Sequence, residues 1–378
     1  MSRTIEHLAR LVAHKTVSDQ SNLGLIEEVK AHLSGLGYRT TRFNDPDAPK
    51  AGLYAEIGPK VPGGILLSAH SDVVPVRGQK WSKEPFALAE DGGKLFGRGT
   101  TDMKGFLAAM LTAADSAATR TLTAPLGLLI SYDEEVGCIG LAKMLPSVGP
   151  LLRAPRLALV GEPTGMRVAI GHKGKRAYRA RVSGQAGHSA LAPRFVNAIN
   201  VAARFVTGLE DLQTDLAARG VHDVAYDIPG TTVHVGTLSG GRALNIVPDT
   251  AELTFEFRHL PEDDPDAIEA KVEKAASAAD AAYGTADAIE ITRTISYPGF
   301  NAIDTDAIAL LRNATGTETC KVAFGTEAGL LAALSIPTLV CGPGDMDGQG
   351  HMPDEFISRT ELDRCDRMLA ALLQEISA

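Results

Sequence analysis

Residues 64–72 read Gly-Ile-Leu-Leu-Ser-Ala-His-Ser-Asp, and this stretch predicts both the fold and a site. The apolar run from Ile65 to Ala69 has the length of a buried strand, and it ends on His70. In α/β proteins, sites form at the carboxyl ends of parallel strands. His70 is therefore placed where it can bind a metal, with Asp72 accepting the other imidazole N–H. The alternative is a loop histidine that caps the strand.

Two further segments bring carboxylates to similar positions. Residues 97–105 contain Asp102 and open a helical run, so this aspartate is either a ligand or an ordinary helix N-cap. The apolar run 126–132 leads into Asp133, Glu134 and Glu135. Adjacent carboxylates at one sheet edge repel one another unless a cation lies between them. One glutamate can then bind metal while its neighbour takes a proton from water.

The last two segments complete a set of oxygen and nitrogen ligands. An apolar run over 156–161 ends on Glu162, and another over 337–344 leads to His351. Imidazole and carboxylate ligands without thiolate suit zinc, cobalt or manganese, and open coordination positions are typical of catalytic sites. The pattern predicts two divalent metals, a spare carboxylate and hydrolysis of an amide bond.

With these segments, the chain resembles the dizinc aminoacyl hydrolases, a family of deacetylases, desuccinylases, aminoacylases and carboxypeptidases. The resemblance covers nearly the whole chain, and its motifs are residues 68–75, 97–105, 133–137, 161–164, 187–189, 245–248 and 351–355. It implies that Asp102 bridges two zinc ions, for which cobalt or manganese can substitute. By the same resemblance, His70 and Glu162 complete one metal site and Glu135 and His351 complete the other. Glu134 is then the general acid and base.

Residues 325–329 and 341–344 are most similar to the acetylornithine deacetylases of that family, whereas residues 345–350 depart from their pattern. The resemblance implies N2-acetylornithine as substrate, with Gly325, Thr326 and Glu327 as substrate-binding residues. Glu327 stands at an expected helix start, where it either complements the helix dipole or faces a cationic side chain. A desuccinylase, a general aminoacylase, a dipeptidase and a metal-bound protein without catalysis remain as alternatives.

The chain is longer than one hydrophobic core usually serves, so we expect two domains. Alternating strands and helices predict an α/β domain with a mainly parallel sheet, formed by residues 1–174 and 297–378. Residues 175–296 follow a β-α-β-β-α-β order, which predicts an inserted ferredoxin-like α+β domain. In the resembled family such an insert dimerises, which implies a homodimer. The expected helices are 25–33, 105–118, 197–212, 266–282 and 361–376, and the expected strands of the insert are 177–182, 231–238, 251–258 and 289–295.

The insert has three candidate residues of its own. His188 lies in a glycine-rich loop, and the resemblance implies that it hydrogen-bonds the tetrahedral oxyanion in a neighbouring subunit's site. Asn245 resembles a second polar substrate contact. Arg258 ends a strand, and its planar guanidinium matches a substrate α-carboxylate. The alternatives are an exposed loop histidine and a surface arginine on an edge strand.

Charge and targeting signals narrow the function further. Lys and Arg number 37 against 46 Asp and Glu, and the net charge of −9 argues against nucleic acid or an anionic membrane as a partner. The first residues form no apolar signal segment, so we expect a cytoplasmic protein. Four cysteines without paired spacing predict free thiols in a reducing compartment.

Overall fold

A computed structural model describes residues 2–378 of the chain. Contacts divide these residues into two compact units. The inserted unit consists of residues 172–299 with 323–325, and the larger unit consists of the remaining residues. The expected insert, 175–296, lies inside the inserted unit. No helix among residues 2–378 is both long enough and apolar enough to cross a membrane.

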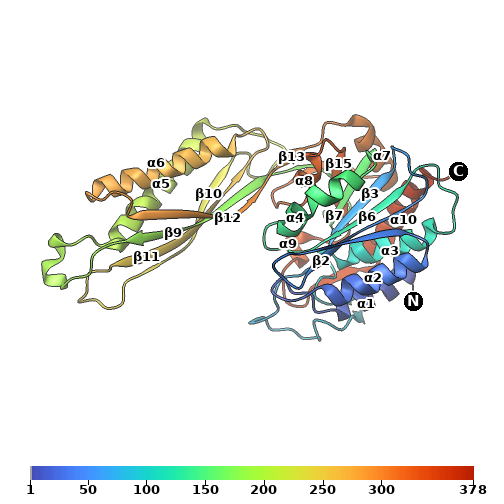
Figure 1. Cartoon of the computed structure of the whole chain (residues 1–378), viewed down its shortest axis with the longest axis horizontal. Helices are drawn as coiled ribbons and strands as arrows, with labels where there is room; N and C mark the ends of the chain where they lie inside the picture. The colour runs from blue at the N-terminus through green and yellow to red at the C-terminus, as the bar shows by residue number, and fades with distance from the viewer. Residues whose placement is uncertain (1) are drawn as a thin grey trace. The chain divides into compact units, whose positions relative to one another are not determined.

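The larger unit is built around one large mixed sheet (Figure 1). Its helices and strands before the insert are α1 (Arg3–Ala13), α2 (Leu23–Gly35), β1 (Arg39–Asn44), β2 (Ala51–Ile57), β3 (Ile65–His70), β4 (Ala89–Asp91), β5 (Lys94–Phe96), α3 (Lys104–Ala117), β6 (Leu126–Ser131), α4 (Ile139–Val148), β7 (Leu157–Pro163) and β8 (Val168–His172). After the insert come β13 (Phe300–Asn301), α7 (Thr305–Thr315), β14 (Thr319–Val322), α8 (Ala328–Ala332), β15 (Thr338–Gly342), α9 (Met346–Gln349), β16 (Phe356–Ser358) and α10 (Arg359–Gln374).

The strand order of the large sheet is β1-β2-β6-β3-β7-β15-β8-β13, with β14 paired to β8. The central strands β6, β3, β7 and β15 are parallel, whereas β2 pairs with β6 and β8 pairs with β15 in antiparallel fashion. The predicted α/β class is therefore confirmed, with antiparallel strands flanking a parallel centre. Because parallel strands are buried on both faces, β3 and β6 are buried throughout and read as continuous apolar runs.

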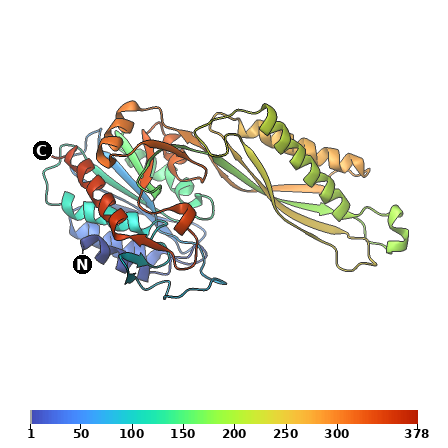
Figure 2. The ribbon, with the colours of Figure 1, turned by 180° about the vertical axis from the view of Figure 1, so that it is seen from behind.

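Helices cover both faces of this sheet. Ile65, Leu67 and Ala69 belong to one apolar cluster, which includes residues of α1, α2, α3 and α10. Leu66, which points the other way because side chains alternate along a strand, belongs to a second cluster with residues of α4 and α8. Seen from behind, α10 and α3 lie side by side over their face of the sheet (Figure 2). The core on both faces thus holds the strand ends in place.

The inserted unit has the expected β-α-β-β-α-β order, which confirms the predicted ferredoxin-like insert. Its elements are β9 (Gly174–Ser183), α5 (Ala198–Arg219), β10 (Thr232–Gly240), β11 (Thr250–His259), α6 (Pro265–Ala282) and β12 (Ile289–Tyr297). The antiparallel strand order is β10-β11-β9-β12, and α5 and α6 pack on one face of that sheet around their own apolar cluster. Helix α5 runs beyond the expected end at residue 212, because Leu216 continues its buried stripe.

Candidate metal centre

Three neighbouring strands deliver the candidate ligands to one edge of the large sheet. Strand β3 ends on His70 and pairs in parallel with β6 on one side and β7 on the other. Residues 133–135 follow β6, and Glu162 lies near the end of β7. Gly161 permits this packing, because a Cβ atom there would lie 1.9 Å from the ring of Phe106. The carboxyl ends of the parallel strands therefore meet at this edge, as expected from the sequence.

His70 is buried and oriented by its own loop. Its Nδ1 atom lies 2.9 Å from the backbone oxygen of Asp72, and a carbonyl oxygen can only accept, so Nδ1 carries the proton. The opposite ring atom, Nε2, lies 3.1 Å from Asp102 Oδ1 and 3.8 Å from Glu162 Oε1. In neutral His70, this tautomer points an unshared electron pair at two carboxylates. Such an arrangement needs either a second proton or a metal ion.

Asp102 contacts an imidazole on each of its two oxygens. Its Oδ2 atom lies 3.1 Å from His351 Nε2, and the same imidazole nitrogen lies 2.9 Å from Glu135 Oε2. Helix α3 begins at Lys104 with Met103 in the N-cap position, so the N-cap interpretation of Asp102 was wrong. The carboxylate instead stands between two histidines, which is the arrangement that a bridging ligand needs.

The carboxylate of Asp72 acts differently from the sequence-based expectation. Its Oδ1 atom is 3.6 Å from His70 Nδ1, beyond hydrogen-bond distance, because the backbone carbonyl of the same residue takes that position. The carboxylate accepts the backbone N–H groups of Glu134 and Glu135 at 3.2 and 3.3 Å. It also accepts the hydroxyl of Ser18 at 2.7 Å, a contact that no motif predicted. Asp72 thus orients the two glutamates rather than the histidine.

The centre contains more buried negative charge than its histidines can balance. Glu135 Oε1 and Glu162 Oε1 are buried and have no hydrogen-bond partner within residues 2–378. Burial raises the pKa of Glu162 and of Glu134 well above the usual range, and burial with the charge of Asp102 raises the pKa of Glu135 to about 7. A buried carboxylate oxygen without a hydrogen-bond partner is costly, so these oxygens are suited to binding cations.

The histidines respond to the same charge. Burial alone would lower the pKa of His70, but the hydrogen bond to Asp102 and the nearby carboxylates raise it well above its ordinary value. Hydrogen bonds to Asp102 and Glu135 raise the pKa of His351 to about 10. Oxygen and imidazole donors lie within 4.8 Å of one another in two overlapping groups, one with His70, Glu134 and Glu162 and one with His70, Asp102 and Glu135. The residues fit a metal centre.

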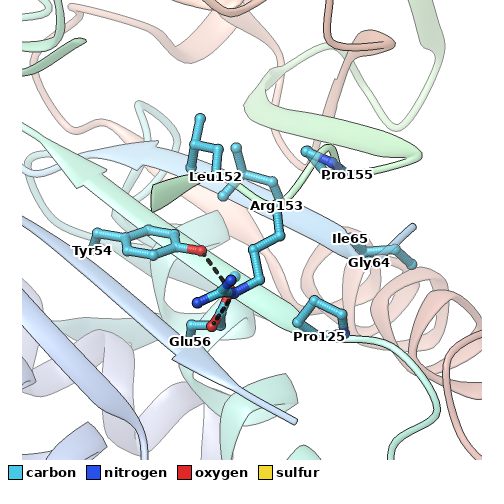
Figure 3. Close-up of a pocket in the computed structure, with 10 residues that line it drawn as sticks. Tyr54, Glu56, Gly64, Ile65, Pro125, Leu152, Arg153 and Pro155 are labelled. Atoms are coloured by element: carbon cyan, nitrogen blue, oxygen red, sulfur yellow. Dashed lines mark hydrogen bonds and ion pairs between the residues drawn. The ribbon is translucent and has the colours of Figure 1, made fainter. Parts of the chain in front are cut away.

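The opposite edge of the sheet holds a small polar cavity of a different kind (Figure 3). It is lined by the amino-terminal ends of β3 and β6, and its volume is about 10 Å³, which is room for one water molecule. Inside it, Glu56 accepts hydrogen bonds from Tyr54 at 3.0 Å and from Arg153 at 3.1 Å. All acidic charge there is paired, so this cavity is structural.

Thr326 and Glu327 belong to the larger unit and are buried. Thr326 accepts the N–H of Ala328 through its hydroxyl at 3.0 Å. Glu327 occupies the N-cap position of α8 without making a side-chain cap hydrogen bond. Its Oε1 atom has no hydrogen-bond partner within residues 2–378, and burial raises its pKa to about 7. A side-chain cap hydrogen bond therefore does not account for Glu327, and complementing the dipole of α8 stays the alternative to binding a cationic group.

The remaining candidates lie in the inserted unit. His188 and Asn245 are on adjoining exposed segments, which are joined by a bridge between His188 and Ile246 and by the bond from Ser189 N–H to the oxygen of Asn245. Arg258 lies on β11, which is flanked by β10 and β9 and so is not an edge strand. Its Nε atom donates to Glu256 at 2.9 Å. Gly325 is a close-packing position, because a Cβ atom there would lie 2.1 Å from the Tyr297 ring.

Comparisons with known proteins agree with this geometry. The sequence pattern of peptidase family M20/M25/M40 matches residues 66–375. An acetylornithine deacetylase from Yersinia pseudotuberculosis is 34% identical over 98% of this chain and 96% of its own length. One from Pasteurella multocida is 32% identical over 98% of this chain and 97% of its own length.

Solved structures share the fold. An M20 family metallo-carboxypeptidase from Sulfolobus solfataricus matches with a TM-score of 0.82 at 19% identity, covering 99% of both chains. A dinuclear metal-binding M20 peptidase from Bacillus subtilis matches with a TM-score of 0.69 at 16% identity, covering 99% of this chain and 98% of its own. The protein is a metal-dependent amidohydrolase, and it belongs to peptidase family M20/M25/M40.

Proposed function

We propose that this hydrolase deacylates an N-acyl amino acid, with N2-acetyl-L-ornithine as its substrate and L-ornithine and acetate as its products. The observation that supports this substrate best is the similarity to acetylornithine deacetylases along 98% of the chain. A desuccinylase, a general aminoacylase or a dipeptidase would use the same centre with a differently shaped pocket, so substrate preference must be measured.

Two divalent ions would be held by the five ligand residues. Asp102 would bridge them, His70 and Glu162 would complete one site, and Glu135 and His351 the other. We propose zinc as the metal, with cobalt or manganese able to substitute, because the donors are imidazole and carboxylate without thiolate. When bound, the ions supply Lewis acidity, which polarises the amide carbonyl and makes a water acidic enough to attack at neutral pH.

Glu134 would move the proton. It has no role as a ligand in this assignment, and Asp72 holds its backbone in place through the N–H group. As a general base, the Glu134 carboxylate would take a proton from the attacking water. It would then deliver that proton to the leaving amine, which departs poorly as an anion.

Residues of the inserted unit would bind the substrate. His188 Nδ1 accepts the N–H of Ala190 at 3.1 Å, so the proton of the neutral imidazole is on Nε2. That N–H is the donor that we assign to the tetrahedral oxyanion in a neighbouring subunit, and Asn245 is a second polar contact. The Nε atom of Arg258 is occupied by Glu256, which leaves its terminal nitrogens as the donors proposed for the substrate carboxylate.

We assign the cationic side chain of the substrate to Glu327. A buried carboxylate with an unpartnered oxygen gains most from an incoming ammonium group, because the pair forms away from water. Glu327→Gln should raise KM for N2-acetylornithine and leave KM for the neutral N-acetylmethionine unchanged. An equal effect on both substrates would reject this role. Gly325 and Thr326 would shape the same loop.

The substrate is tested by amine release from N2-acetylornithine, N-acetylmethionine, N-succinyl-diaminopimelate and a dipeptide, with zinc- or cobalt-loaded protein. A strong preference for N2-acetylornithine that chelator abolishes is the expected result. Preference for another compound would change the proposed substrate but not the proposed metal centre. No turnover of any compound despite two bound ions would favour a metal-bound protein without catalysis.

We also propose that the protein is a cytoplasmic homodimer formed through residues 175–296. Strands β10 and β12 are the edges of the inserted sheet, and an edge strand offers backbone groups to a second copy across a two-fold axis. Cys138, Cys320, Cys341 and Cys365 are all free thiols, as is typical of a reducing compartment. Light scattering of the purified protein should give twice the chain mass, and a monomeric mass would reject the dimer.

A further inference from the structure

A buried ion pair lies directly behind two of the ligands. Arg98 Nη1 donates to Glu355 Oε2 at 2.6 Å, and both side chains are only 1% exposed. The sequence places both residues inside motifs of the resembled family but assigns neither a role. Isolated buried ion pairs contribute little net stability, because removing both charges from water is costly. The purpose of this pair is therefore best sought in what else it contacts.

Glu355 holds the loop that ends on Asp102. Its Oε1 atom accepts the backbone N–H groups of Thr101 at 2.8 Å and Asp102 at 3.1 Å. Its Oε2 atom accepts the N–H of Gly99 at 2.9 Å in addition to Arg98. One carboxylate thus accepts hydrogen bonds from three backbone N–H groups of this loop and from a guanidinium. The backbone of the bridging ligand is fixed to a residue far away in the sequence.

Arg98 holds the loop that carries His351. Its Nη1 atom also donates to the backbone oxygen of Met352 at 3.3 Å, and its Nη2 atom donates to Gln79 Oε1 at 2.6 Å. Gln79 Nε2 in turn donates to the backbone oxygen of His351 at 2.8 Å. This support matters because the side chain of His351 is 50% exposed, whereas that of His70 is fully buried. His351 has little packing of its own to fix it.

We propose that Arg98, Glu355 and Gln79 are positioning residues that set the metal affinity of the site formed by Asp102, Glu135 and His351. They hold two chain segments, 97–102 and 351–355, at the separation that lets Asp102 and His351 bind one ion. Partners behind metal ligands typically change affinity 10–100-fold when removed. The site completed by His70 and Glu162 depends on them less, because only the bridging Asp102 is shared. This inference rests on the proposed dinuclear centre.

The test is calorimetric titration of Zn²⁺ into chelator-treated protein, with Co²⁺ absorption spectra as a second readout. Wild-type protein should bind two ions. In Glu355→Gln, the NH2 of the new side chain must face backbone N–H groups, from which it cannot accept a hydrogen bond. One of the two Zn²⁺ affinities should therefore fall about 10–100-fold, and the Co²⁺ spectrum should change. Arg98→Lys keeps the charge but loses the planar guanidinium with its several N–H donors, so we expect a smaller loss of Zn²⁺ affinity at the same site.

Glu56→Gln is the matched control, since Glu56 is also a buried carboxylate bonded to an arginine but lies at the opposite sheet edge. It should lower stability without changing either Zn²⁺ affinity. Gln79→Ala, at a half-buried position, covers the case in which Glu355→Gln fails to fold, and it should weaken the same site several-fold. Unchanged affinities in Glu355→Gln, or in Gln79→Ala if the former does not fold, would overturn the inference. Equal losses in Glu56→Gln would also overturn it, whereas a wild-type protein that binds no Zn²⁺ would overturn the metal centre itself.

Discussion

The larger unit contains two clusters in which a carboxylate lies between two histidines. In the metal centre, the oxygens of Asp102 lie 3.1 Å from His70 and 3.1 Å from His351. At a junction of helices α1, α2 and α3, the oxygens of Asp115 lie 2.9 Å from His7 and 2.7 Å from His32. By ligand type and distance the two clusters are alike.

They differ in their surrounding charge. Arg3 donates to Asp115 at 2.8 Å, so the carboxylate of the helix junction is neutralised by the protein itself. Among residues 2–378, no arginine pairs with Asp102 in the candidate metal centre. This centre also contains buried oxygens of Glu135 and Glu162 that have no hydrogen-bond partner within those residues. Unbalanced buried negative charge, rather than a set of ligand-type residues, therefore distinguishes the candidate metal centre from the helix junction.

Catalytic activity should show the largest difference between variants of the candidate metal centre and variants of the helix junction. Glu134→Gln should lower kcat for the preferred substrate by about 10²–10⁴-fold, because proton transfer by a positioned side chain contributes about that much. Metal content, measured by atomic emission, should stay at the wild-type level. The matched variant His32→Gln, in the helix junction, should keep its activity. Loss of metal from Glu134→Gln would instead make this glutamate a ligand.

Neutralising the carboxylate between the two histidines should lower the metal content of the protein in one cluster and leave it unchanged in the other. Asp102→Asn should lose at least one of two bound ions and nearly all activity, because the bridging charge is gone. Asp115→Asn should retain both ions and most activity but lower the free energy of unfolding by about 1–3 kcal/mol, since it weakens hydrogen bonds to charged partners. Loss of metal from Asp115→Asn would show that the helix junction also binds an ion.

Acid should affect the helix junction through His7. Burial lowers the pKa of His7 more than the hydrogen bond to Asp115 raises it, and the neighbouring His32 and Arg3 add to the lowering. The unfolded chain therefore takes up this proton at higher pH than the folded protein. The resulting stability is fully present above about pH 6.5 and is lost as pH falls through that value towards the lower folded pKa.

Urea unfolding of wild type and His7→Gln, with chelator present throughout, measures this contribution. The stability difference between them should be largest near pH 8 and should shrink towards pH 5. A difference that grows as the solution becomes more acidic would mean that His7 is protonated in the folded protein.

The smallest expected effect comes from removing the neutralising cation. Arg3→Met leaves Asp115 between two histidines without a positive charge, so the helix junction should begin to resemble the metal centre. We expect a weak additional Zn²⁺ site in calorimetric titration, absent from wild type and abolished by His32→Gln in the same background. No additional binding would show that Arg3 is not what distinguishes the clusters.

Much of the fold follows from local pattern. The expected helices and insert strands all occur, with the largest boundary error at the end of α5. Helix α1 was not predicted, although Ile5, Leu8 and Val12 recur at helical spacing and are buried. The candidate ligand positions could also be predicted from the sequence, because an apolar strand that ends on a histidine or an acid has the same local signature wherever its neighbours lie.

The roles of the residues that hold the candidate ligands in place could not be predicted in this way. Asp72 was expected to hold the His70 ring, but the loop turns so that its carbonyl does so and its carboxylate holds Glu134 and Glu135. Glu355 lies in a recognised motif, yet nothing in that motif says that it accepts the N–H groups of a loop more than 250 residues earlier. Such contacts depend on loop conformation, which local residue preferences specify weakly.

Residues close together along the chain specify the α/β class, the inserted unit, the strand ends and the chemical types of the candidate ligands, so all of these could be predicted from local pattern. Which carboxylates have a neutralising cation beside them depends instead on contacts that form on folding. After folding, Asp102 and Asp115 each lie between two histidines, and the contact of Arg3 with Asp115 is what distinguishes them. Local pattern cannot predict these contacts, because electrostatic energy depends on distance in space and on burial, and His351 reaches Asp102 across 249 residues of chain.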